Sequence, residues 1–98
     1  MWELYVFSFL AGLFAANALP HLVKGGTGQR FQTPFGKNSS AIVNVLWGWA
    51  NALLAVIFLH FSHPWPHAYR ASVTFVLAAL VMLVVNALIF SRGVKHSK

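Results

Sequence analysis

Three histidines close together in the chain are the first residues whose type and spacing suggest chemistry. His60, His63 and His67 follow the pattern H-x2-H-x3-H. Imidazole is a common metal ligand, so three of them could bind zinc or copper and leave one position open. Pro64 and Pro66 lie between them, however, and prevent one helix from presenting all three on one face. A pH-sensitive loop and ordinary histidines at a membrane interface are the alternatives, and the last needs the fewest assumptions.

Four asparagines are the second candidate, because they lie in or at the ends of otherwise apolar runs. If these runs cross a membrane in alternating directions, Asn17, Asn44 and Asn86 lie toward the same side, and Asn51 lies near mid-depth. A buried amide that forms no hydrogen bond costs several kcal/mol, so the four should face protein or water. They predict a polar layer that either bonds the helices together, the commoner role, or binds a solute.

The basic, glycine-rich segment 20–40 is the third candidate. The run from Gly25 to Gly28 offers consecutive backbone N–H groups that can form an anion-binding nest, although the ending of a Walker loop is missing. Two phenylalanines are more than a solvated linker needs, so we expect the segment to fold back onto the membrane face or the mouth of the helices. It could rest on anionic lipid headgroups, dock a partner subunit or bind a small anion. The candidate residues are Lys24, Gly25, Gly26, Gly28, Arg30, Phe31, Phe35 and Lys37.

Apolar runs must position these residues. The chain has 98 residues, 58% hydrophobic and 8% charged, whereas soluble proteins average about 25% charged. Three runs, about 2–19, 41–61 and 71–91, are each near the length that crosses a bilayer, where only helices satisfy the backbone. The sequence therefore predicts an all-α integral membrane protein, with residues 1–98 as one domain of three transmembrane helices. The first run lacks a positive leading segment, which favours an uncleaved helix over a signal peptide.

The distribution of positive charge predicts how the chain crosses the membrane. Three spans put the segment 20–40 and the tail 92–98 on one side, and the N-terminus and the loop 62–70 on the other. Of the 7 lysines and arginines, only Arg70 falls in the second group. The positive-inside rule then places the first group in the cytoplasm, consistent with a bacterial inner membrane. The cations of the first group are Lys24, Arg30, Lys37, Arg92, Lys95 and Lys98.

Local signals predict where the helices end. Pro20 should end the first helix, because proline cannot continue the hydrogen-bond ladder without loss. Ser39 and Ser40 can cap the start of the second. Arg92 and Gly93 are typical of a helix end and predict the end of the third helix.

The composition also excludes several classes of function. The chain has no cysteine and one carboxylate side chain, Glu3, so no catalytic constellation is present and we expect no enzyme. We expect no cofactor, because His21 and His60 lie at opposite ends of the spans and cannot share a haem within one chain. Nucleic acid is not an expected partner. Anionic lipid is, together with another membrane protein or a second copy of the chain.

Two functions remain from the sequence. The first is a small membrane protein that acts through protein–protein contact, as an accessory or assembly subunit of a larger complex. The alternative is a homo-oligomeric channel or carrier for a small neutral or anionic solute, with Asn44, Asn51 and Asn86 along the path.

Overall fold

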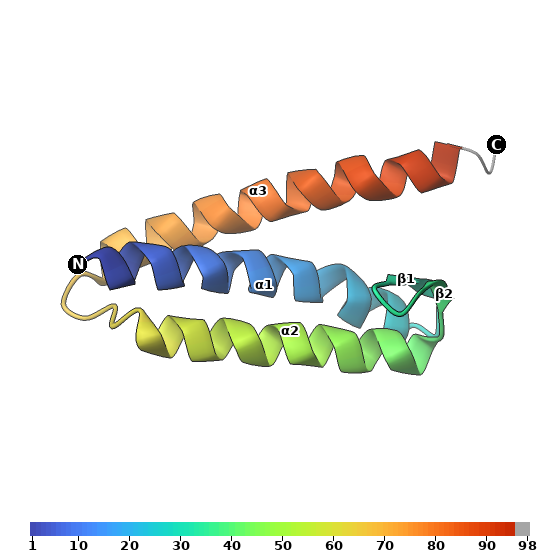
Figure 1. Ribbon diagram of the computed structural model, residues 1–98, viewed down its shortest axis with the longest axis horizontal. Helices are drawn as coiled ribbons and strands as arrows, with labels where there is room; N and C mark the ends of the chain where they lie inside the picture. The colour runs from blue at the N-terminus through green and yellow to red at the C-terminus, as the bar shows by residue number, and fades with distance from the viewer. Residues whose placement is uncertain (96–98) are drawn as a thin grey trace.

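Three long helices and a short hairpin make up the fold. The computed structural model describes the backbone of residues 1–95 and the side-chain surroundings of residues 1–89. The helices are α1 (Trp2–Gly26), α2 (Ala41–Phe61) and α3 (Ala68–Lys95), and β1 (Phe31–Thr33) pairs with β2 (Gly36–Ser39) between α1 and α2 (Figure 1). All three helices are long and apolar enough to cross a membrane. This confirms the three long apolar helices predicted from the sequence, with a small hairpin added.

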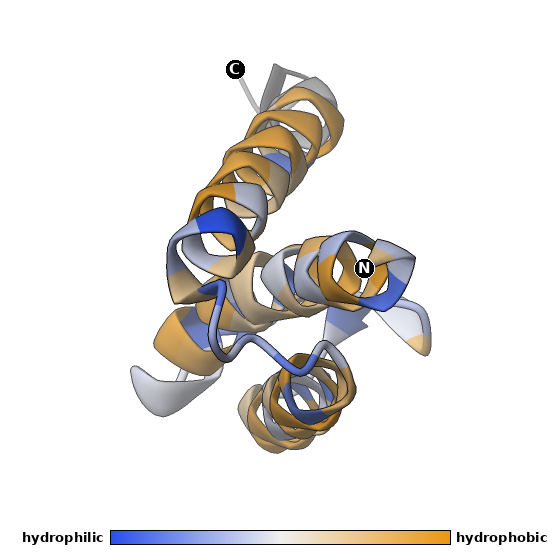
Figure 2. Cartoon of the chain, turned by 90° about the vertical axis from the view of Figure 1, so that its left-hand side faces the viewer, coloured by the Kyte–Doolittle hydropathy of each residue, from blue (hydrophilic) through white to orange (hydrophobic). Residues whose placement is uncertain are grey.

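Helix α1 lies in the middle of an open arrangement. It packs against α2 along one side and α3 along another, whereas α2 and α3 make at most marginal contact with each other in the described part of the chain. Figure 1 shows α3 diverging from the other helices toward its C-terminal end. Seen end-on, the helices are hydrophobic around much of their circumference (Figure 2). The outer faces of α2 and α3 therefore suit lipid or another apolar surface.

Two glycines bring the helices close together. A Cβ atom on Gly12 would overlap the backbone carbonyl of Phe75 and lie 2.8 Å from the Cβ of Ala78, so α3 touches the α1 backbone there. A Cβ on Gly48 would lie 2.7 Å from Cγ of Leu22, so α2 also lies close to α1 there. Small residues at such crossings let helices gain packing contacts that larger side chains would prevent.

The end of α1 differs from the prediction. Pro20 lies inside the helix, which continues to Gly26, and neighbouring helices commonly support an internal proline in membrane spans. The helix stops instead at Thr27, whose hydroxyl bonds the carbonyls of Val23 and Lys24. Gly28 follows with φ 77°, a left-handed conformation that favours glycine and commonly ends a helix.

The predicted loop 20–40 is not found as a loop. Its first part, through Gly26, belongs to α1, and residues 31–39 form the hairpin. Thr33 pairs with Gly36 across a tight turn whose first central residue is Pro34, a favoured position for proline. The Thr33 and Ser39 hydroxyls are 2.6 Å apart across the strands. The glycine content concealed this order, because a hairpin needs turn residues as much as a flexible linker does.

The other helix ends agree only in part with those predicted from the sequence. Helix α2 has the predicted bounds, and Ser40 caps it by accepting a bond from the Val43 amide at 3.2 Å. Helix α3 begins at Ala68, before the predicted start, and runs to Lys95, so Gly93 does not end it. The predicted cytoplasmic tail 92–98 therefore begins within a helix. The side chains of Arg92 and Lys95, and all of Lys98, lie outside the described residues.

Candidate functional site: a polar cleft beside the hairpin

Three of the four asparagines form one chain of hydrogen bonds across the three helices. Asn17 on α1 donates to Oδ1 of Asn51 on α2 at 3.1 Å. Asn86 on α3 donates to Oδ1 of Asn17 at 3.4 Å. Asn51 is 1% exposed, and its own amide donates to the Trp47 carbonyl at 2.8 Å. The amides therefore bond one another between helices.

The carbonyl of Trp47 fixes the direction of this chain. Because a carbonyl only accepts, the Asn51 NH₂ must face it, which leaves Oδ1 of Asn51 to accept from Asn17. Oδ1 of Asn17 then accepts from Asn86 in the same way. Oδ1 of Asn86 has no hydrogen-bond partner among residues 1–89. The chain of amides thus ends at an acceptor on α3.

Asn44 belongs to a different group, at the start of α2. It is fully buried, and its NH₂ lies 3.0 Å from the Phe31 carbonyl, 3.2 Å from that of Ser39 and 3.0 Å from that of Ser40. One amide therefore holds both strands of the hairpin against α2. We call this group the hairpin clamp. The sequence grouped Asn44 with Asn17 and Asn86, whereas in the structure Asn44 bonds the hairpin and His21 and not the other asparagines.

His21 completes the clamp from α1 and is only 3% exposed. Its Nδ1 lies 2.9 Å from Oδ1 of Asn44. Since the Asn44 NH₂ is directed at carbonyls, Oδ1 can only accept, and Nδ1 of His21 must carry the proton. In the neutral imidazole, Nε2 is then an acceptor. The clamp thereby assigns a tautomer to a buried histidine.

A polar cleft of about 290 Å³ lies between these two groups. Asn17 and Asn86 line one part of it and His21 another. The hairpin and the apolar side chains of α2 and α3 supply the remaining walls. The full lining is Asn17, His21, Gln32, Thr33, Pro34, Trp47, Met82, Asn86 and Ile89.

Charge around the cleft is positive. Lys24 Nζ lies over the Phe31 ring, 5.8 Å from its centroid, and Arg30 donates to the Asn38 carbonyl at 3.0 Å. The one acid of the chain, Glu3, lies at the other end of α1, 3.8 Å from the terminal amino group. The cleft therefore suits a neutral or anionic group better than a cation.

The predicted anion-binding nest is occupied by the end of the helix. The amide of Thr27 bonds the Val23 carbonyl at 3.2 Å, and the amide of Gly28 bonds that of Gly25 at 3.0 Å. Gly25 itself lies against the start of α2, where an added Cβ would be 2.6 Å from the Ala41 carbonyl. Gly26 has open space beside it. The glycines serve helix termination and close packing, so these amides are not free for an anion.

The two phenylalanines of the hairpin have different surroundings. Phe31 is partly buried, with its ring 5.4 Å from that of His21. Phe35 lies at the hairpin tip and is 73% exposed, although its ring packs nearly perpendicular to that of Trp47, with 5.5 Å between the ring centroids. Lys37 is also exposed, on β2. The hairpin thus turns one aromatic ring inward and presents the other.

The three histidines at the end of α2 and in the turn that follows it do not converge. The ring centroids of His60 and His63 are 6.3 Å apart. Among the described residues, no three histidine, cysteine, aspartate or glutamate side chains lie close enough together to bind a metal ion. His67 follows the proline-containing turn and is exposed. The predicted metal site is therefore not formed in this part of the chain.

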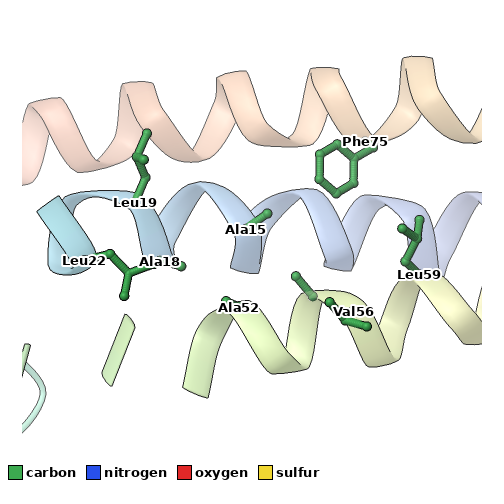
Figure 3. Close-up of a pocket in the computed structure, with 9 residues that line it drawn as sticks. Ala15, Ala18, Leu19, Leu22, Ala52, Val56, Leu59 and Phe75 are labelled. Carbon is green, nitrogen blue, oxygen red and sulfur yellow. The ribbon is translucent and has the colours of Figure 1, made fainter. Parts of the chain in front are cut away.

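A second hollow, of about 270 Å³, lies between the helices but has almost no polar lining. Figure 3 shows Phe75 of α3 reaching toward α1 above it, with Val56 of α2 on the other side. Nothing in that lining directs a reaction or fixes a polar ligand, so it suits a lipid chain.

Sequence reasoning missed His21, Gln32, Thr33 and Trp47 as residues of the cleft. His21 follows Pro20, and with the first helix assumed to end there it was taken as a residue of the helix end. The detectable signal was the spacing of Asn17 and His21, four residues apart, which places both on one face if the helix continues. The hairpin residues gave no comparable signal. No protein-family model, curated protein or solved structure matches this chain.

Proposed function

We propose that this chain is a small integral membrane protein that acts through protein–protein contact, as an accessory or assembly subunit of a larger membrane complex. The observation that carries the proposal is the hairpin clamp. Asn44 bonds the carbonyls of Phe31 and Ser39, one from each strand, and so fixes the hairpin on the helices. Attraction to lipid headgroups needs no such order, whereas a docking element benefits from being held in its bound shape.

The side chains of the fixed hairpin support the same proposal. Phe35 projects from the tip, and Lys37 and Arg30 lie nearby on the exposed strands or beside them. An aromatic anchor with flanking cations is typical of protein interfaces, where aromatic residues and arginine are enriched. The partner surface would then offer an apolar pocket with acidic groups around it.

Orientation forms part of the proposal. Among the described residues, Lys24, Arg30 and Lys37 lie at the hairpin end, and Arg70 lies at the opposite end beside Tyr5, 3.4 Å from its hydroxyl. The positive-inside rule favours the hairpin end in the cytoplasm and the N-terminus outside, as in a bacterial inner membrane. The partner site would accordingly lie at the cytoplasmic surface.

The alternative of an asparagine-lined path has less support. Asn44 and Asn51 are 0% and 1% exposed and bond to groups of the same chain. A solute would have to displace those bonds to use the side chains. Bonds of this kind are what the alternative role, holding the helices together, requires.

Site-specific photo-crosslinking in the native membrane tests the proposal. A benzophenone amino acid replaces Phe35 in one variant and Trp65 in another. Trp65 is the matched control, because it is 80% exposed and lies at the opposite end of α2. We expect position 35 to give a discrete crosslinked species that contains a second, different polypeptide, and position 65 to give none of it.

Three other results would count against the proposal. Crosslinks only to lipid at position 35 would favour headgroup contact. A crosslinked product of two copies of this chain would favour the homo-oligomer. The same polypeptide at both positions would show that the hairpin is not the docking element.

A further inference from the structure

We propose that the polar cleft binds a lipophilic molecule whose head group carries a hydroxyl group. The cleft lies where the apolar helices meet the polar hairpin, and neither neighbouring group of hydrogen bonds uses all of its polar atoms. The inference concerns those remaining atoms and does not depend on the docking role of the hairpin.

His21 supplies the acceptor. Its Nδ1 is committed to Asn44, and Nε2 has no hydrogen-bond partner among the described residues. In the same part of the chain, the only fully buried polar side-chain atom without a partner is Ser8 Oγ. Nε2 must therefore reach accessible space, and the cleft is the space that His21 lines. A hydroxyl on a ligand can donate to it.

The asparagines supply complementary groups on the other side of the cleft. Asn17 uses one N–H for Asn51 and accepts one bond from Asn86, which leaves a second N–H. Asn86 retains Oδ1 and one N–H in the same way. A head that both donates and accepts, as a hydroxyl does, matches His21 and these amides together.

The rest of the lining is apolar and fits a hydrocarbon tail. Met82 and Ile89 come from α3, which diverges from α2, and Trp47 faces them from α2. Because α2 and α3 scarcely touch, the cleft is bounded laterally by side chains and not by a continuous wall of helix. A molecule in the bilayer can enter from the side with its tail still in lipid.

Two sources share this chemistry. One is a hydroquinone with an isoprenoid or alkyl tail, and the other is the glycerol headgroup of phosphatidylglycerol. The experiment uses one probe for each source and asks which probe gives a saturable signal.

Trp47 provides the signal for the test, because it lines the cleft. Replacing the other three tryptophans by phenylalanine leaves it as the only indole of the full-length protein, and all three are exposed, namely Trp2, Trp49 and Trp65. One probe is decylhydroquinone, with its dimethyl ether as the matched compound without a donor. The other is phosphatidylglycerol with brominated acyl chains, with phosphatidylcholine bearing the same chains as its match.

We expect saturable quenching of Trp47 by one hydroxyl-bearing probe and only linear quenching by its match. A second single-tryptophan protein that retains Trp65 instead reports partition into the membrane at the far end, and it should show no saturation. Linear quenching of Trp47 by both hydroxyl probes, equal to that by their matches, would overturn the proposal. In the protein that retains Trp47, no residue that lines the cleft is changed.

Two substitutions at His21 then separate binding from folding. In His21→Asn the side-chain amide occupies the place of Nδ1, keeps the bond to Asn44 and removes Nε2. In His21→Gln the amide reaches the place of Nε2 and loses Nδ1. We expect His21→Asn to weaken binding about tenfold, as for one lost hydrogen bond, with Gln retaining most of it. Equal binding by His21→Asn and the unchanged protein would overturn the role of Nε2, and with it the proposed site.

Discussion

Nδ1 of His21 and Oδ1 of Asn44 lie 2.9 Å apart, and this contact joins α1 to the residue that holds the hairpin. Asn44 then bonds Phe31 and Ser39 in the two strands. The position of the hairpin is therefore set by two buried side chains from two helices. An amide whose NH₂ lies within hydrogen-bond distance of three carbonyls is costly to replace, because buried carbonyls are then left without a donor.

Replacing Asn44 by leucine should release the hairpin. Leucine has a similar size but cannot bond any of the three carbonyls or His21. With a loss of about 1–3 kcal/mol, the hairpin should open roughly 5- to 150-fold more often. The measurement is the rate of trypsin cleavage after Arg30 and Lys37, which flank and lie within the hairpin.

Asn38→Ala is the control for that experiment. Asn38 lies in β2 and is exposed, and Arg30 bonds only its backbone carbonyl. Its cleavage rate should match that of the unchanged protein. Equal rates for Asn44→Leu and Asn38→Ala would show that the clamp does not hold the hairpin.

Alanine at three glycines should destabilise the fold in a definite order. At Gly12 the new methyl group meets the backbone of Phe75, which cannot move without separating α3 from α1. At Gly48 it meets chiefly the side chain of Leu22, which can rotate. At Gly26 it meets nothing within 4 Å.

We therefore expect Gly12→Ala to lower the free energy of unfolding most, by about 1–3 kcal/mol, as overpacking commonly does. Gly48→Ala should cost less. Gly26→Ala should be neutral or slightly stabilising, because alanine favours helix over glycine. Circular dichroism during titration of mild detergent with dodecyl sulfate measures all three. A Gly26→Ala loss as large as that of Gly12→Ala would refute the packing argument.

The sequence predicted the helices well but not the geometry between them. Apolar length and the cost of an unpaired backbone in lipid fix three spans, and Ser40 fixes one helix start, because these effects act within a short segment. Pro20 led to a wrong prediction of where the first helix ends. The tendency of proline to end a helix was outweighed by the packing of α1 against α2 beyond this residue. Where Asn44 turns depends on the hairpin, and where His21 points depends on Asn44. Neither contact between distant residues is encoded in a local pattern.

A double-mutant cycle between Asn17 and Asn51 tests whether the amides join the helices. Leucine at either position removes the bond that Asn17 and Asn51 share. Leucine at both positions loses no more of this bond than either single change does. For interhelical hydrogen bonds the coupling energy is about 0.6 kcal/mol. Unfolding in detergent should show coupling of that size and of stabilising sign.

The path hypothesis makes the opposite prediction for the same variant. If Asn51 lined a solute path, Asn51→Leu would leave stability unchanged and abolish flux in reconstituted vesicles. Strict additivity in the cycle together with lost flux would therefore reject the interhelical interpretation. Measurable coupling with no flux in either protein would support it.

The orientation of the chain can be tested cleanly because it has no cysteine. A single cysteine is placed at Lys37 in the hairpin or at His67 between α2 and α3, and both positions are exposed. The two lie at opposite ends of α2 (Figure 1). If the positive-inside rule governs this chain, a membrane-impermeant maleimide should label the His67→Cys protein in intact cells. The Lys37→Cys protein should be labelled only after the membrane is permeabilised.

The reversed pattern would place the hairpin, and any partner bound to it, on the outer side. Labelling of both positions in intact cells would show a mixture of orientations, which the uneven charge distribution disfavours.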